Sequence, residues 1–202
     1  MKNLKMIGLL VAAALIFSVP AQAQKFHYGV KAGTNFAVQS GVAEYYDNSN
    51  ILVGGHYGFA TSYNLNKNMM LKAELNYNNE GSKSSSVTQK FNYLSVPVLY
   101  DYSFGNINSG KTTIHLNIGP SVSFLLHAGK TIHNHGIKTT TDLTSQMHNA
   151  QLSGILGVGL MQPVGKHFIT VDLRLNVAVT RFKADDSQSH NKMIGVYLGY
   201  ML

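Results

Sequence analysis

The feature that most constrains this chain is a strand-like segment with charged residues in its middle. The segment FITVDLRLNVAVT, residues 168–180, alternates between aliphatic and polar residues. Successive side chains of a strand point to opposite faces, so one face here is wholly aliphatic while the other carries Asp172, Arg174 and Asn176. Such a strand separates an apolar environment from a polar one. The other strands decide which of the two lies outside.

The same period-two alternation recurs along the chain, and no segment has helical periodicity. We expect eight strands, at residues 25–37, 51–65, 69–80, 89–104, 111–126, 149–163, 167–182 and 191–202. The connections between them alternate in length. Those at 66–68, 105–110 and 165–166 are short and rich in turn formers, whereas those at 38–50, 81–88, 127–148 and 183–190 are longer. This alternation is typical of an up-and-down barrel with tight turns at one end and loops at the other.

The second face of these strands is small and polar, with charges at mid-strand. Three basic and three acidic residues share it, at Lys31, Lys72, Glu74, Asp101, Asp172 and Arg174. In a soluble sandwich, glycines on this face would weaken the strands without any gain in packing, whereas a narrow closed barrel needs small residues beside long ones. The sequence therefore predicts an all-β, eight-stranded antiparallel up-and-down transmembrane β-barrel with the aliphatic face toward lipid. The soluble alternative, a lipocalin-like periplasmic binder, would carry its apolar faces inward.

The N-terminus predicts export. Residues 1–23 contain two lysines, an apolar run from Met6 to Val19 and the small-x-small sequence Ala21-Gln22-Ala23. These are the three parts of a cleaved secretory signal peptide. We expect cleavage after Ala23, which leaves 24–202 as one outer-membrane barrel domain with a formal net charge of +5. The chain has no cysteine, and its basic residues are scattered, which argues against a disulfide framework and against nucleic-acid binding.

The last ten residues, MIGVYLGYML, end the chain inside an alternating strand. Val196, Leu198, Tyr200 and Leu202 share one face of it. This pattern resembles the signal read by the outer-membrane barrel assembly machinery, which is therefore the expected partner during biogenesis, with outer-membrane lipid around the finished barrel.

Six segments, taken in order, resemble one family. They are FHYGVKAGTNFA (26–37), LKAELNYNNEG (71–81), FNYLSVPVLYDYSF (91–104), LNIGPSVSFLL (116–126), GILGVGL (154–160) and ITVDLRLNVAVT (169–180). The mature chain thereby resembles the PorT-like outer-membrane β-barrel family of Gram-negative bacteria. The resemblance implies a small eight-stranded barrel, and the member that names the family is linked to a protein-secretion and gliding system.

The interior charges allow a plugged lumen or a conducting pore. Eight strands enclose an interior that side chains just fill, and a buried charge must be paired. We therefore expect a closed ion-pair network in which acidic groups drawn from Glu74, Asp101 and Asp172 hold Arg174.

The connections offer two further candidate sites. His127, His133, His135 and His148 could bind a borderline metal at the surface, although no established zinc spacing is present. Asp185, Asp186 and His190 could form a catalytic site at the rim, but no nucleophile motif accompanies them. Solvated loops are the commoner explanation of both, so we expect no enzyme activity, cofactor or metal.

The sequence thus predicts a structural or interaction role in which the long connections, especially 127–148, lie at the cell surface. An accessory role in a protein-secretion system is the alternative, and a narrow pore is the third hypothesis.

Overall fold

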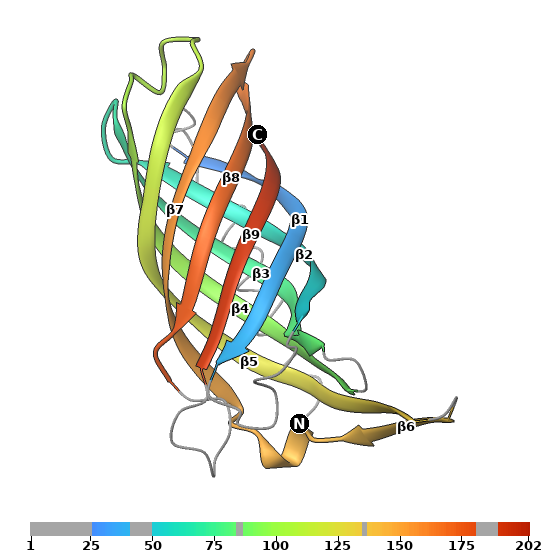
Figure 1. The fold of residues 1–202 in the computed structure, drawn as a ribbon. Coiled ribbons are helices and arrows are strands. Elements are labelled where there is room, and N and C mark those ends of the chain that lie inside the picture. The colour runs from blue at the N-terminus through green and yellow to red at the C-terminus, as the bar shows by residue number, and fades with distance from the viewer. Residues whose placement is uncertain (1–25, 41–49, 84–86, 135–136, 181–189) are drawn as a thin grey trace, which may run out of the picture.

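The computed structural model describes residues 26–40, 50–83, 87–134, 137–180 and 190–202. These residues form nine strands and a short 3-10 helix, η2 (Thr144–Gln146). The strands are β1 (Phe26–Ser40), β2 (Asn50–Asn64), β3 (Met69–Lys83), β4 (Val87–Ser103), β5 (Thr113–Asn134), β6 (Ile137–Asp142), β7 (Ala150–Val164), β8 (His167–Ala178) and β9 (His190–Met201) (Figure 1).

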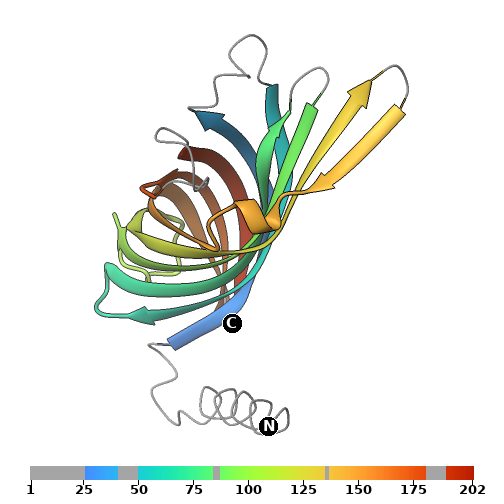
Figure 2. The same ribbon diagram turned by 90° about the horizontal axis from the view of Figure 1, so that it is seen from below.

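Eight of the nine described strands close into an antiparallel barrel. The order is β1-β2-β3-β4-β5-β7-β8-β9, and β9 returns to pair with β1 from Gly29↔Met201 to Ser40↔His190. Figure 2 shows the resulting ring of strands from one end. The short connections and the C-terminus lie at one end, called here the turn end, and the other is called the loop end. The predicted eight-stranded antiparallel barrel is confirmed.

The two faces of each strand lie as the alternation predicts. On β8, Val171 is 43 % exposed while Asp172 and Arg174 are 1 % and 3 % exposed. Most exposed large side chains of the other barrel strands are likewise aliphatic or aromatic, and the buried ones are mainly polar. The polar face therefore lines the lumen, and the outer surface is apolar. Within the described residues, no helix is long and apolar enough to cross a membrane.

The prediction that residues 127–148 form a long loop is wrong. β5 continues to Asn134, and β6 pairs with it from Gly129↔Asp142 to Asn134↔Ile137. This segment has polar residues on both faces, so it lacks the alternation that marks a membrane strand, yet its threonines and isoleucines favour extended backbone. β3 and β4 also run beyond their expected ends, to Lys83 and from Val87.

These extensions form a sheet beyond the barrel. We call it the projecting sheet and define it as residues 79–83 of β3, 87–92 of β4, 127–134 of β5, and β6. In Figures 1 and 2, β5 and β6 lean away from the barrel. β6 pairs with β5 alone, so its other edge is free of any described strand.

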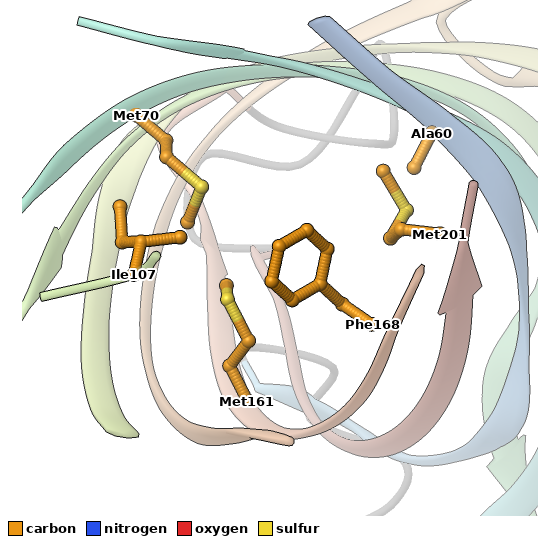
Figure 3. Packing of buried hydrophobic residues seen from close by; sticks show 6 residues of the cluster. All are labelled: Ala60, Met70, Ile107, Met161, Phe168 and Met201. Carbon is orange, nitrogen blue, oxygen red and sulfur yellow. The ribbon is translucent and has the colours of Figure 1, made fainter. Parts of the chain in front are cut away.

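Two clusters of buried apolar residues lie at opposite ends of the lumen. The turn-end cluster, shown in Figure 3, contains Ala60, Met70, Ile107, Met161, Phe168 and Met201. Ile107 comes from the β4–β5 connection, whose backbone bonds to the β2–β3 turn through Ile107 N–H and Lys67 O at 2.8 Å. The loop-end cluster contains Phe91, Tyr93, Ala128 and Met147. The alternation alone did not predict these clusters, because it predicts a small and polar lumen.

The face assignment predicts different outcomes for two substitutions on β8. Val171→Arg should lower the yield of folded barrel, because a cation on the lipid face costs about 2–4 kcal/mol near the bilayer midplane. Asn176→Ala removes only a lumen amide and should fold nearly as well. Heat-modifiable migration on gels after refolding into lipid vesicles measures both yields. Equal yields would mean that the two faces are reversed.

Candidate functional site

A network of buried charges occupies the middle of the lumen. All six predicted residues contribute to it, from four strands: Lys31 on β1, Lys72 and Glu74 on β3, Asp101 on β4, and Asp172 and Arg174 on β8. Their side chains are buried. Positions far apart in the sequence meet because strand closure brings β1 beside β9 and β8 across the narrow lumen from β3.

Glu74 and Asp172 organise the larger part of this network. Arg174 donates two hydrogen bonds to Glu74, Nη1 to Oε2 at 2.8 Å and Nη2 to Oε1 at 2.9 Å. Lys31 Nζ lies between the two acids, 3.0 Å from Glu74 Oε1 and 2.8 Å from Asp172 Oδ2. Arg174 Nη2 also reaches Asp172 Oδ2 at 3.5 Å. Two-pronged pairing of this kind fixes the guanidinium in one orientation.

A second pair lies beside the first. Lys72 Nζ is 2.5 Å from Asp101 Oδ2, so Asp101 forms its ion pair with Lys72 and not with Arg174. His115 on β5 links the two groups, since its Nε2 lies 2.8 Å from Asp172 Oδ1 and 3.8 Å from Asp101 Oδ2. The expectation that Arg174 could draw on Asp101 is therefore not met, because the stagger of the strands places Lys72 nearer.

Three neutral side chains complete the network. Asn76 donates to Glu74 Oε2 at 3.0 Å, and Asn117 donates to Asp172 Oδ1 at 3.3 Å. The ring of Tyr197 faces both cations, with its centroid 5.5 Å from Lys31 Nζ and 5.7 Å from Arg174 Cζ. Cations over an aromatic face gain further attraction when they are desolvated.

Sequence reasoning missed His115, Tyr197 and Glu80. His115 and Tyr197 occupy inward positions, which was the available signal, but their partners lie on strands that are distant in the sequence. Glu80 is a fourth buried carboxylate, on the loop-end side of β3, and it forms no ion pair within the described residues. The described part of the lumen therefore holds four acidic and three basic buried residues, and not the predicted three of each.

Inward glycines make room for the long side chains. A Cβ on Gly157 would lie 2.5 Å from Asn117 Oδ1 and 2.7 Å from Arg174 Cγ. A Cβ on Gly195 would lie within contact distance of the Tyr197 ring. Gly157 and Gly195 are the neighbours of Arg174 on β7 and β9 in the register. Gly157 thus leaves room for the Arg174 side chain, and Gly195 leaves room for the Tyr197 ring that faces its guanidinium.

A small cavity lies next to Arg174, lined by groups that include His56, Asn76, Ser121 and Tyr197. Its volume of about 20 Å³ suits a water molecule, which needs about 10–15 Å³ and two or more polar partners. His56 Nε2, Asn76 Oδ1, Ser121 Oγ and Arg174 Nε have no partner among the described protein residues and supply such contacts.

The predicted histidine site is not assembled in the described residues. His127 is exposed on β5, and His148 is exposed between η2 and β7. His133 is described only as backbone in β5, and His135 lies outside the described residues, as do Asp185, Asp186 and the side chain of His190. No three described histidines or carboxylates gather where a metal ion could bind.

Thr144, in the segment that follows β6, holds this segment to β5. Its hydroxyl and its backbone N–H donate to Asp142 Oδ1 at 2.5 and 2.8 Å, and its Oγ1 accepts from Ala128 N–H at 3.0 Å. The hydroxyl bond first, and the N–H bond second, hold the pKa of Asp142 below its usual value. The projecting sheet is therefore anchored at its base.

A family model described as "Outer membrane protein beta-barrel domain" matches residues 21–183. The chain belongs to this family. The matched region ends before β9, which the structure nevertheless places as the strand that closes the barrel of this outer-membrane protein.

Three solved outer-membrane proteins are similar to the barrel in structure. They are Ail, the attachment invasion locus protein of Yersinia pestis (12 % identity, TM-score 0.47, covering 88 % of this chain and 99 % of that chain), Neisserial surface protein A (14 %, 0.49, 85 % and 95 %) and OprG from Pseudomonas aeruginosa (10 %, 0.45, 88 % and 94 %). No curated protein sequence matches the chain.

Three of the proposed assembly residues of the outer-membrane barrel lie on β9, and Leu202 follows directly after it. Val196, Leu198, Tyr200 and Leu202 are all exposed on its lipid side. On the other side of the same strand, Met193, Tyr197 and Met201 are buried. The last strand thus contributes to the membrane surface, to the charge network and to the turn-end cluster at once.

The ion-pair network predicts non-additive effects on stability. Arg174→Ala leaves the buried carboxylates of Glu74 and Asp172 with one cation fewer. It should lower the free energy of unfolding by about 3–5 kcal/mol, and with it the urea midpoint in lipid. Adding Glu74→Gln should restore part of this loss. Asn176→Ala is the control for a lumen substitution without a charge. Additive losses, together with steady conductance of the wild type in planar bilayers, would show that the charges line an open path.

The glycines predict a second contrast, between two positions of β7. Gly157→Val should destabilise the barrel by about 1–3 kcal/mol, because its side chain would displace Arg174 and Asn117. Gly154→Val adds the same atoms on the lipid side, where nothing lies within 4 Å of the new Cβ, and should be nearly neutral. Urea titrations followed by circular dichroism compare the two. Similar midpoints would refute the packing role of Gly157.

Proposed function

We propose that this outer-membrane barrel has a structural and interaction role, in which a closed lumen supports the projecting sheet at the cell surface. The turn end faces the periplasm, since short turns are periplasmic in barrels of this kind. The observation that carries the proposal is the projecting sheet itself, whose edge strand β6 has no described neighbour on its outer side.

Closure of the lumen is supported by the charge network. The side chains that would carry ions through a pore instead bind one another at 2.5–3.5 Å. The turn-end cluster lies between this network and the turns, so an ion would also have to pass Phe168 and three methionines. The proposed role is non-enzymatic, since the charged groups of the network are engaged with one another.

An interaction role is supported by the backbone of β6. A free strand edge presents unpaired N–H and C=O groups, and an extended segment of another protein can add to it as a further strand. The residues of β6 include three consecutive threonines and no proline, so no residue of the strand lacks the backbone N–H that such pairing uses. The partner we propose is therefore a protein segment in extended conformation.

The resemblance to PorT-like barrels suggests where such a partner could come from. An accessory role in protein secretion fits the same geometry, because the partner would then be a component of the secretion system. Cleavage after Ala23 and recognition of β9 by the assembly machinery belong to this proposal as the route to the membrane.

Substitutions at the β6 edge test the proposal. Thr139→Lys with Thr141→Lys places two cations on the edge strand, which should prevent a further strand from adding. Asn108→Lys with Ser109→Lys makes the same charge change at the exposed turn end and is the control. Affinity capture from native membranes, followed by mass spectrometry, compares both variants with the wild type.

We expect a partner that the wild type and the turn-end variant capture and the edge variant loses. Secretion components among the lost proteins would favour the accessory role. A partner retained equally by all three proteins would contradict binding through β6.

A further inference from the structure

The lipid-side face of the projecting sheet has a composition unlike the rest of the outer surface. The register shows which residues share this face, because directly opposed residues of an antiparallel pair lie on the same side. Tyr77, Leu94 and Phe124 form one row across β3, β4 and β5 and belong to the apolar band. The adjacent row toward the loop end is Asn79, Asn92 and His127. The apolar band thus ends at one level on three strands.

The rows above this boundary are basic and rich in hydrogen-bond donors. Lys90 lies between Gly81 and Gly129 in the next row, which ends at Asp142 on β6. Lys83 begins the row after it, followed by Thr88, Thr131 and Thr140. With Lys138, this face carries three lysines against one aspartate. Lys83 and Lys90 are both exposed. They are diagonal neighbours on paired strands, and such positions are about 7–8 Å apart, so two lysine side chains can reach one anion. The flanking glycines leave the space around Lys90 open.

Negative charge is scarce on this outer surface. The buried acidic residues Glu74, Glu80, Asp101 and Asp172 all face the lumen. Asp142 is the one exposed acidic side chain in the described ranges, and its carboxylate is already bonded to Thr144. The lipid-side face of the projecting sheet therefore presents a net positive charge next to the membrane.

The face that carries Lys83 and Lys90 continues the lipid-facing band of β3 and β4 beyond the barrel. β5 and β6 of the same sheet swing away from the barrel in both views (Figures 1 and 2). Lys90 is four residues beyond Leu94, about 13 Å along the strand. With strands tilted by about 35–45°, this places the lysine at the level of lipid headgroups and above the acyl chains.

We propose that Lys83 and Lys90 bind the phosphate groups of phosphorylated lipids in the membrane leaflet at the loop end. Asn79, Asn92 and His127 form the lower border of the site, where Asn79 already donates to Asn92 Oδ1 at 2.7 Å. Lys138, on the same face of β6, extends the site outward. The proposal goes beyond the interaction at the β6 edge, because it uses the face of the sheet and a lipid partner.

Spin-labelled lipids measure this binding directly. The refolded full mature chain is reconstituted in phosphatidylcholine with a trace of labelled phosphatidic acid or labelled phosphatidylcholine, and electron paramagnetic resonance gives the motionally restricted fraction of each. Each lysine near a charged lipid surface changes binding about five-fold at low salt. Lys83→Gln with Lys90→Gln should therefore reduce the preference for phosphatidic acid about ten-fold or more.

Two further variants serve as controls. Lys67→Gln with Lys166→Gln removes two exposed lysines from the turn end and should leave most of the preference intact. Lys83→Arg with Lys90→Arg keeps both charges and should behave as the wild type. Heat-modifiable migration verifies that every variant is folded.

Equal losses in the Lys83/Lys90 and Lys67/Lys166 variants would overturn the proposal. Full competition by inorganic phosphate at the same ionic strength would also overturn it, since the site would then take free phosphate and not lipid. The measurement uses no protein partner and does not depend on the orientation of the barrel in the cell. Failure of partner capture at β6 with lipid preference intact would thus refute the proposed function alone.

Discussion

The closed barrel of this molecule depends on the requirement that no backbone polar group be left unpaired in hydrocarbon. A sheet meets this requirement in a membrane only when it closes on itself. The pairing of β1 with β9 removes both edges over twelve residue pairs. Above the membrane the requirement is relaxed, because water can satisfy free groups. The open edge of β6 is consistent with this difference, since it lies in the part of the chain that projects beyond the barrel.

Closure of only eight strands then determines the chemistry of the lumen. The interior is too narrow for water to solvate six charges separately, so those charges must be arranged in contact. Lys31 meets this condition by lying within 3.0 Å of two acids, and Arg174 by its double bond to Glu74. Glycines on the neighbouring strands supply the volume. The charged residues and the glycines of the inner face thus depend on each other, because the long charged side chains pack only where their neighbours are small.

The sequence was sufficient for the fold and for the faces, because the period-two alternation repeats on all eight barrel strands. It also identified the six charged residues that meet in the lumen. It could not assign their partners, since the pairing of Lys72 with Asp101 depends on the stagger between strands, which alternation does not determine. β6 was missed because both of its faces are polar. Met70, Met161 and Met201 were missed because inward methionines at strand ends do not differ in pattern from the polar positions beside them.

The pairing of the first strand with the last has a consequence for how the barrel can form. Lys31 and Gly199 are partners although they are separated by nearly the whole described chain. Until β9 is in place, β1 and β8 both present open edges that cannot enter hydrocarbon, and the final contact closes a loop of more than a hundred residues. An intermediate lacking β9 therefore has no stable place within the bilayer. The exported chain must remain unfolded yet unaggregated until its last twelve-residue strand is available, so membrane insertion and folding become a single event.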